Sequence, residues 1–257
     1  MISNLVREAK TRFYQTFASK PQRIQLDKAI ISFSFDDAPK SAFENGLPIL
    51  DKHAIKATFY IAAGLTGGDY TEHDKEGNQI SFLSNTDIKT LDHEGHHIGC
   101  HTYSHYMLNQ GTAEQMECDA AKNIQTLKEL IGEKPVEHFS YPFGQVSFKA
   151  KQLLGKHYKT MRSSRPGINT TDTDLYLLRA ISIYHSKFSK PTMQNIINDT
   201  LNKGGWLVFY THGVDDNPGD YDCTAEQLDW VINQSVKSGA HILPIVDAYN
   251  LITQRSE

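Results

Sequence analysis

The segment Ile30-Ile31-Ser32-Phe33-Ser34-Phe35-Asp36-Asp37 is a run of apolar and small residues that ends in two adjacent carboxylates. β-Branched and aromatic residues in such a run favour a buried strand. Similar runs recur along the chain, and segments with helical spacing of apolar residues separate most of them. The eight predicted strands are 29–35, 57–62, 97–101, 137–141, 159–163, 178–183, 206–211 and 241–245.

Helical patterns lie between these runs, at 41–53, 85–94, 112–131, 146–157, 192–203 and 224–237. Thr224 and Gln227 have the spacing of a capping box, which marks the start of the last helix. Alternating strands and helices predict an α/β fold with a mostly parallel sheet, either closed as a barrel or open and doubly wound. A chain of 257 residues has the usual size of one closed barrel.

Residues 1–28 precede the first predicted strand and have a different composition. They are basic, and their apolar residues recur at roughly helical spacing. We interpret them as a helical extension that packs on the outside of the barrel. A helix lying on a membrane surface, formed by residues 1–24, is the alternative.

The overall composition excludes several classes of protein. A net charge of −4 does not fit a nucleic-acid-binding surface. We find no apolar run long enough for a membrane span and no apolar stretch typical of a secretory signal. The three cysteines show no paired spacing. We therefore expect a cytoplasmic protein without a nucleic-acid partner, and the sequence does not indicate an oligomeric state.

Asp36 and Asp37 follow directly on the first predicted strand. In barrels, the carboxyl ends of the strands form the catalytic face. An adjacent pair of carboxylates is not specific by itself, because it also suits a solvated turn or the cap of the next helix. Two ionised carboxylates side by side also repel each other, so they need a compensating charge.

His101 and His105 lie four residues apart at the end of another predicted strand. Two imidazoles at this spacing can bind one metal ion, and a carboxylate can complete a catalytic site of three protein ligands. If Asp37 is that carboxylate, the metal removes the repulsion and leaves Asp36 free as a base. Two histidines at this spacing are common by chance, so the pattern gains its meaning from Asp36 and Asp37.

His212 follows the predicted strand 206–211, again at a carboxyl end. Alone, it would be an ordinary polar loop residue. Beside a metal ion it is a suitable general acid, because a histidine can release a proton near neutral pH.

Four motifs in this order resemble those of the polysaccharide deacetylase family, the NodB-like proteins of carbohydrate esterase family four. SFDDAP at 34–39 is similar to T-F-D-D-G-P, and HTYSH at 101–105 is similar to H-[ST]-x-x-[HD]. YPFG at 141–144 resembles the end of R-x-P-[YF]-G, and YTHG at 210–213 resembles the L-x-H motif. The resemblance implies a distorted (β/α) barrel of about seven to eight mostly parallel strands, over residues 29–257.

The resemblance also implies a reaction: hydrolysis of an N-acetyl group on a polysaccharide, oligosaccharide or glycan precursor, to give a free amine and acetate. The metal would be a divalent cation, with Zn²⁺ expected. The implied roles are metal binding for Asp37, His101 and His105, base catalysis for Asp36, acid catalysis for His212, and oxyanion or substrate contacts for Phe143 and Tyr141.

Two departures from the family pattern affect this interpretation. Ser140 stands where the third motif has an arginine that orients the catalytic aspartate, and a hydroxyl cannot replace that charge. The D-x-x-D-W motif that supports the late histidine is absent. We predict that Arg162 or Arg165, at the next strand end, supplies the missing charge. The departures leave two alternatives: a hydrolase of linear or cyclic non-sugar amides, and an inactive carbohydrate-binding relative.

Overall fold

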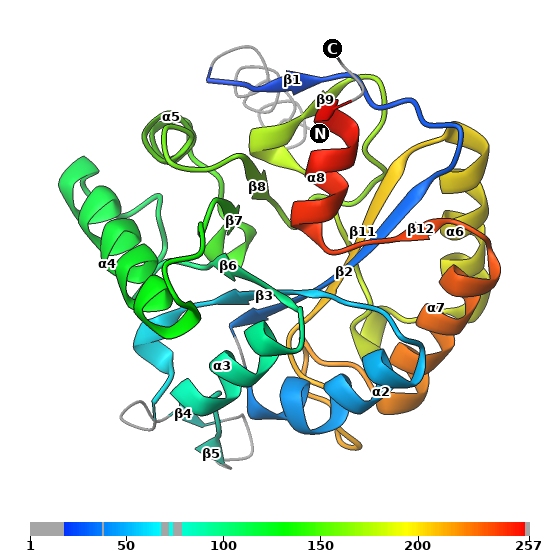
Figure 1. The fold of residues 1–257 in the computed structure, drawn as a ribbon, viewed down its shortest axis with the longest axis horizontal. Helices are drawn as coiled ribbons and strands as arrows, with labels where there is room; N and C mark the ends of the chain where they lie inside the picture. The colour runs from blue at the N-terminus through cyan, green and yellow to red at the C-terminus, as the bar shows by residue number, and fades with distance from the viewer. Residues whose placement is uncertain (1–17, 38, 68–71, 74–78, 255–257) are drawn as a thin grey trace, which may run out of the picture.

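A computed structural model describes residues 18–37, 39–67, 72–73 and 79–254. Within them, a curled, parallel sheet is surrounded by helices (Figure 1), and its strands follow in the order β10-β11-β2-β3-β6-β7-β8, with β12 also paired to β2. The strands are β2 (Ile30–Asp37), β3 (Thr58–Ile61), β6 (His97–Cys100), β7 (His138–Ser140), β8 (Thr160–Arg162), β10 (Ile181–Ser182), β11 (Trp206–Thr211) and β12 (His241–Ile242).

Strand β2 is the centre of the sheet. Strand β11 pairs with it along one side, while β12 and then β3 share the other side. The two ends of the sheet approach each other at 178–182, where Leu178 bridges Arg162 of β8 and Ile181 pairs with Phe209 of β11. The predicted distorted barrel of parallel strands is therefore confirmed, and its irregular part is this short closing segment.

Most helices pack around the outside of the sheet, whereas α8 packs in the inner core (Figure 1). A π-helical turn at Ala42–Gly46 leads into the first of them. The helices are α2 (Leu47–Lys52), α3 (Asn85–His93), α4 (Ala113–Ile131), α5 (Phe148–Leu154), α6 (Lys190–Lys203), α7 (Ala225–Lys237) and α8 (Ile245–Gln254). The predicted capping box at Thr224 and Gln227 is present at the start of α7.

Short elements connect these parts. Strands β4 (Glu72–His73) and β5 (Gln79–Ile80) pair with each other, and β1 (Pro21–Gln22) pairs with β9 (Thr173–Asp174). Single 3₁₀ turns lie at Ala63–Leu65, Pro142–Gly144, Leu175–Leu177 and His185–Lys187.

Successive residues of β2 serve two cores, because side chains alternate along a strand. Ile31, Phe33 and Phe35 belong to the outer core, which lies between the sheet and the helices. Ile30 faces the inner core, together with Trp206 and Val208 of β11. The carboxyl end of β2 is therefore held by packing on both faces of the sheet.

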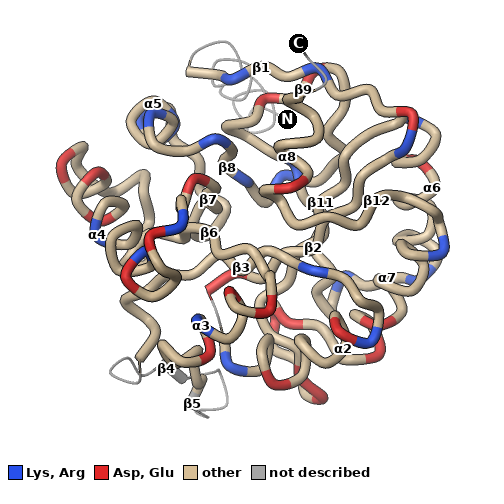
Figure 2. Tube along the Cα trace, viewed as in Figure 1, with Lys and Arg blue, Asp and Glu red and all other residues tan. Residues whose placement is uncertain are grey.

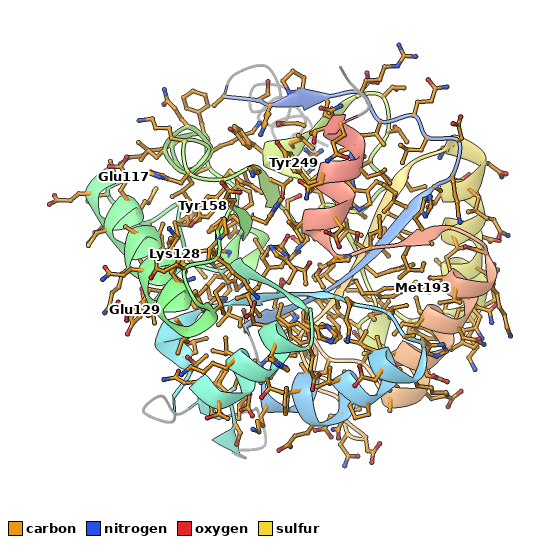
Figure 3. The ribbon with its side chains drawn as sticks, viewed as in Figure 1. Glu117, Lys128, Glu129, Tyr158, Met193 and Tyr249 are labelled. Atoms are coloured by element: carbon orange, nitrogen blue, oxygen red, sulfur yellow. The ribbon has the colours of Figure 1, made fainter. Side chains whose placement is uncertain are left out.

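Helix α8 corrects one prediction from the sequence. The strand predicted at 241–245 ends at Ile242, and a helix begins at Ile245. The helix buries Ile245, Ala248 and Ile252 in the inner core, at helical spacing. Tyr249 lies on the same helix (Figure 3). The centroid of its ring is 5.5 Å from the centroid of the His138 ring. The helix therefore fills the end of the barrel near the first residues of β6 and β7.

Most of the predicted N-terminal helical extension, residues 1–17, lies outside the described residues. Residues 18–28 are described and are not helical. They form β1 and then contribute Ile24 and Leu26 to the inner core, so this part of the chain packs as an extended segment against the barrel.

Acidic and basic residues are mixed along the outer helices (Figure 2). Glu117 and Glu129, for example, are exposed on α4, on the side facing away from the sheet (Figure 3). Among the described residues, no helix is both long and apolar enough to cross a membrane.

Candidate metal centre and active site

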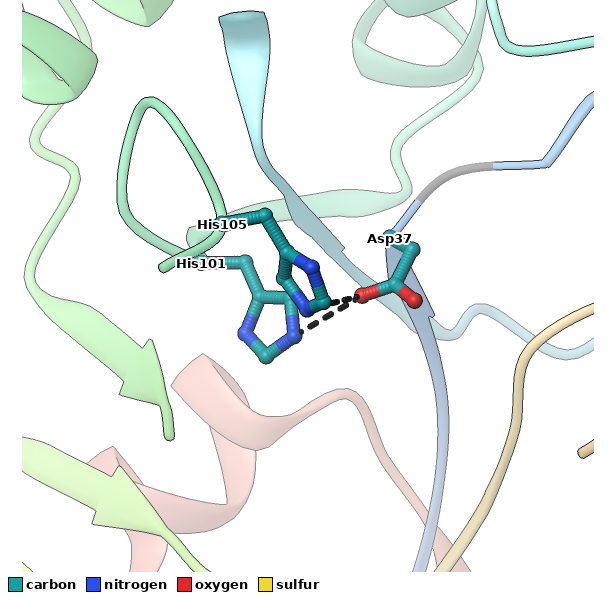
Figure 4. A group of neighbouring side chains, drawn as sticks. All are labelled: Asp37, His101 and His105. Atoms are coloured by element: carbon teal, nitrogen blue, oxygen red, sulfur yellow. Dashed lines mark ion pairs between the residues drawn. The ribbon is translucent and has the colours of Figure 1, made fainter. Parts of the chain in front are cut away.

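Asp37, His101 and His105 come together at the carboxyl ends of β2 and β6 (Figure 4). The Nε2 atoms of both histidines lie 3.0 Å from the same atom, Oδ1 of Asp37. Burial would raise the pKa of Asp37, but His212 and the contacts with His101 and His105 lower it well below its usual range. The carboxylate is therefore ionised and opposes two imidazoles.

The proton positions indicate that this group suits a cation. Nδ1 of His101 lies 2.8 Å from the carbonyl oxygen of Ser140, and a carbonyl only accepts, so Nδ1 carries the proton. In the neutral ring, Nε2 then directs a lone pair at Asp37. Within the described part of the chain, Oδ1 of Asp37 is buried and no group donates a hydrogen bond to it. Two acceptors that face each other at this distance fit a shared metal ion, and the bond from Nδ1 to a carbonyl is typical of a metal-binding histidine.

The backbone at this centre is strained. Four non-glycine residues here have positive φ: Asp37 (67°), Thr102 (62°), His105 (49°) and Phe143 (56°). Such conformations cost about 1–3 kcal/mol each and persist where the surrounding structure fixes them, often at functional sites. At Asp37 the left-handed turn ends the alternation of β2, so that Asp36 and Asp37 both serve the same centre.

Asp36 is held by Arg162, which is 1% exposed. Nη2 of Arg162 contacts both Oδ2 of Asp36 and the hydroxyl of Ser140, while the guanidinium carbon lies 4.5 Å from the Tyr210 ring centroid. The second carboxylate oxygen, Oδ1 of Asp36, is buried and has no hydrogen-bond partner among the described residues. One oxygen of Asp36 is thus fixed and the other is left to accept a proton.

The structure separates the two predicted arginines. Arg162 reaches Asp36 because the pairing of β7 and β8 sets it beside Ser140. Arg165 lies near Lys151 instead, where burial and, to a smaller extent, the charge of Arg165 lower the lysine pKa. Arg162 is therefore the arginine that supplies the charge beside Asp36.

Tyr141 does not belong to the site, contrary to the prediction. Its side chain is 1% exposed and packs in the outer core, and its hydroxyl donates to the carbonyl of Tyr176 at 3.1 Å. The reason is alternation: Ser140 points inward to Arg162, so Tyr141 points to the helix layer.

Phe143 lies at the rim of the site. Its ring is 53% exposed, and its centroid is 4.5 Å from that of His105. The proposed contact of its amide with an oxyanion stays a prediction.

His212 lies on the other side of Asp37, with its Nε2 atom 3.5 Å from Oδ2 of Asp37. Its Nδ1 atom lies 3.2 Å from the carbonyl oxygen of Tyr221. The rings of Tyr184 and Tyr221 flank the imidazole at 5.6 and 5.4 Å. Tyr221 is not among the residues predicted from the sequence, where the only signal is that its loop begins immediately after His212.

A second group of potential ligands, Asp51, Glu94 and His96, lies at the opposite ends of the strands from the metal centre. Nδ1 of His96 accepts a hydrogen bond from the amide of Ala57, so the ring proton is on Nε2, which is 3.3 Å from the Lys56 ammonium. His96 therefore has no lone pair to offer a metal, and we assign none here.

Comparisons with known proteins place the chain among related sequences and folds. The family model described as polysaccharide deacetylase matches residues 23–161, just over half of the chain. A putative polysaccharide deacetylase of Bacillus subtilis, YxkH, is 23% identical over 66% of this chain and 59% of its own length. A peptidoglycan-N-acetylglucosamine deacetylase of Bacillus cereus is 30% identical over 47% of this chain and 38% of its own length.

Among solved structures, Bacillus subtilis PdaA, a family 4 carbohydrate esterase, aligns with a TM-score of 0.61 at 18% identity, over 97% of this chain and 89% of that one. A carbohydrate esterase family 4 pseudoenzyme from Bacillus anthracis aligns with a TM-score of 0.59 at 14% identity, over 86% of this chain and 66% of that one. At these identities the likeness establishes the fold only. The matches to the curated relatives named above span less than two thirds of those relatives' lengths.

Proposed function

Since the chain belongs to the polysaccharide deacetylase family, we propose that it is a metal-dependent deacetylase that removes an N-acetyl group from a saccharide and releases acetate and a free amine. The observation that carries the proposal is the convergence of His101, His105 and Asp37 beside a second carboxylate with one unpartnered oxygen. Related sequences include enzymes named for peptidoglycan and chitooligosaccharide substrates, which supports a sugar substrate.

Asp37, His101 and His105 would hold a divalent cation, and the nitrogen-rich ligand set favours Zn²⁺. Such an ion, when bound, activates water and polarises an acyl carbonyl. Oδ1 of Asp36 takes the proton from the attacking water, while Arg162 keeps the other oxygen in place. As the carbon–nitrogen bond breaks, Nε2 of His212 gives a proton to the leaving amine.

The test combines metal analysis of the purified protein with acetate release from N-acetylated saccharides and from simple cyclic and linear amides. We expect about one metal ion per chain and acetate from a saccharide. Replacing Asp36 with asparagine should reduce kcat by two to four orders of magnitude, because it removes the general base. Release from simple amides alone would favour the non-sugar alternative, and a folded, inactive protein would favour the binding alternative.

The cytoplasmic location predicted from the sequence is also a proposal, and it favours a saccharide intermediate over a finished wall polymer as substrate. Cell fractionation with an antibody against the chain tests it.

A further inference from the structure

We propose that Tyr221 and Asp222, in the loop that follows His212, form the leaving-group side of the active site, with Tyr221 acting twice: its backbone carbonyl orients His212, and its ring contacts the sugar that carries the amine. The proposal rests on the function proposed above. It also accounts for the missing D-x-x-D-W motif, since His212 has a partner from its own loop.

The carbonyl of Tyr221 is a shared acceptor. It receives the backbone amide of His212 at 3.1 Å, Nδ1 of His212 at 3.2 Å and the hydroxyl of Thr211 at 3.3 Å. Because a carbonyl only accepts, Nδ1 of His212 carries a proton, and Nε2 is the atom that faces Asp37 and the site. This places the nitrogen that serves the leaving amine on the correct side of the ring.

Asp222 holds the loop in this position. Its Oδ1 atom accepts from the amide of Gly213 at 2.6 Å, and its Oδ2 atom accepts from the amide of Gly219 at 3.1 Å. Its carbonyl accepts from the amide of His185 at 2.8 Å. A side chain at Gly213 would collide with Asp222 and Ser41, since a Cβ there would lie 2.8 and 2.6 Å from their oxygens. Asp222 is therefore a positioning residue that acts on His212 through Tyr221.

The ring of Tyr221 is free to contact a substrate. It is 62% exposed, whereas its neighbour Tyr184, on the other flank of His212, is 5% exposed. The group that His212 protonates is the amine on the sugar, so that sugar must lie beside His212, where Tyr221 offers an exposed aromatic face. Phe143 is exposed on the opposite side, over His105. Two exposed rings on either side of the metal ligands fit a substrate of several linked sugars.

Two variants separate the two actions of Tyr221. Y221A removes the ring and keeps the backbone carbonyl, whereas D222N keeps the ring and disrupts one of the two amide contacts, because an amide group offers only one acceptor atom. D215N is the matched control: it makes the same charge change in the same loop, and its one described side-chain contact, from the amide of Asn217, needs a single acceptor. Melting temperature and metal content are measured for all three.

We expect Y221A to raise KM for an N-acetylated oligosaccharide about three- to tenfold, the range of one aromatic contact. The ratio of its kcat/KM for the oligosaccharide to that for 4-nitrophenyl acetate should fall by a similar factor. D222N should instead lower kcat roughly 10- to 100-fold, because a misplaced proton donor loses rate more than affinity. D215N should leave both parameters within twofold of the wild type.

Equal effects of Y221A and D222N on the same parameter, or no effect of either, would overturn the proposal. If the wild type releases no acetate from any saccharide, the proposed function fails separately. The orientation of His212 is then decided by ¹⁵N NMR of the imidazole. A shift of the Nδ1 resonance in D222N, but not in D215N, supports the loop's role, and unchanged resonances contradict it.

Discussion

This centre differs from the family pattern in the origin of the charge beside Asp36, which is the guanidinium of Arg162. It comes from β8, yet it meets Ser140 of β7, which stands at the motif position of the usual arginine. Since the two side chains touch, a charge supplied from either position reaches the same carboxylate, Asp36. The departure at Ser140 therefore relocates a charge and does not remove it.

We predict that R162K lowers kcat about 10- to 100-fold while the protein stays folded. Lysine retains the positive charge beside the buried Asp36, but it lacks the planar group that contacts Asp36 and Ser140 together. Alanine is a poorer choice, because breaking a buried ion pair costs about 3–5 kcal/mol and threatens folding. Steady-state kinetics of acetate release, with circular dichroism of each variant, measure the effect.

R165A is the matched control and should retain wild-type kcat. The exchange S140R/R162S, which moves the arginine to the family position, should retain more of the wild-type kcat than R162K, because an arginine still lies beside Asp36. Full activity in R162K, or an equal loss in R165A, would show that the contact with Asp36 has no catalytic value.

At the scale of elements, the pairing of β7 with β8 marks the limit of what the sequence can predict. Periodicity and turn chemistry predict where strands and helices lie and which residues stand at strand ends. Most of these positions are confirmed. The choice between Arg162 and Arg165 depends on register, and register follows from packing that a single sequence does not display. The prediction of Tyr141 as a substrate contact was wrong, although alternation would have argued against it, since Tyr141 follows Ser140, which faces inward.

Two further elements escaped prediction for physical reasons. The start of α8 continues the apolar run of β12, so the two periods merge at Leu243 and Ile245. The contacts of Tyr221 and Asp222 form because the end of their loop folds back onto His212 and Gly213, where the loop begins. Such a loop conformation has no periodic pattern in the sequence. The three proposed metal ligands were easier to locate in the sequence, because Asp37 ends β2, His101 directly follows β6 and His105 is four residues further on.

Helix α3 provides a test of local design. The carboxylate of Asp87 accepts hydrogen bonds from the amide and the hydroxyl of Ser84 in a capping box. It also forms an ion pair at 2.6 Å with Lys40, which lies in the segment after β2. We predict that D87N lowers the free energy of unfolding by about 1–2 kcal/mol, because it loses a charged cap and an ion pair that is only partly exposed. Urea denaturation at pH 7 measures the change.

D199N is the comparison for this prediction, because Asp199 pairs with Lys203 in an exposed position on α6. An exposed pair of this spacing contributes roughly 0.3–0.5 kcal/mol, so D199N should have a smaller effect than D87N. Equal losses in the two variants would mean that the contacts of Asp87 add nothing beyond a surface pair.

For the whole molecule, the two ends of the barrel differ in their polar chemistry. The carboxyl ends of the strands hold the ionised centre, while the opposite end holds three histidines that stay neutral. Burial and the nearby Lys56 lower the pKa of His96 to about 4, and burial lowers that of His97 to about 3. Burial and, to a smaller extent, the charge of Lys159 lower the pKa of His138 well below its usual range.

These histidines predict that the fold is sensitive to acid. Each is neutral in the folded protein but takes up a proton near pH 6.5 in the unfolded chain, so stability is complete above that pH and falls as the pH decreases toward the folded pKa values. Each group contributes a slope of up to about 1.4 kcal/mol per pH unit, and three act together. Urea denaturation at pH 7, 6 and 5 measures the slope.

H138N should reduce this slope by the contribution of about one proton, because asparagine does not titrate. Asparagine can still accept a hydrogen bond from the hydroxyl of Thr160, which lies 2.8 Å from Nδ1 of His138. H93N, at an exposed position at the end of α3, should keep the wild-type slope. If H138N also keeps it, the acid sensitivity arises elsewhere in the molecule.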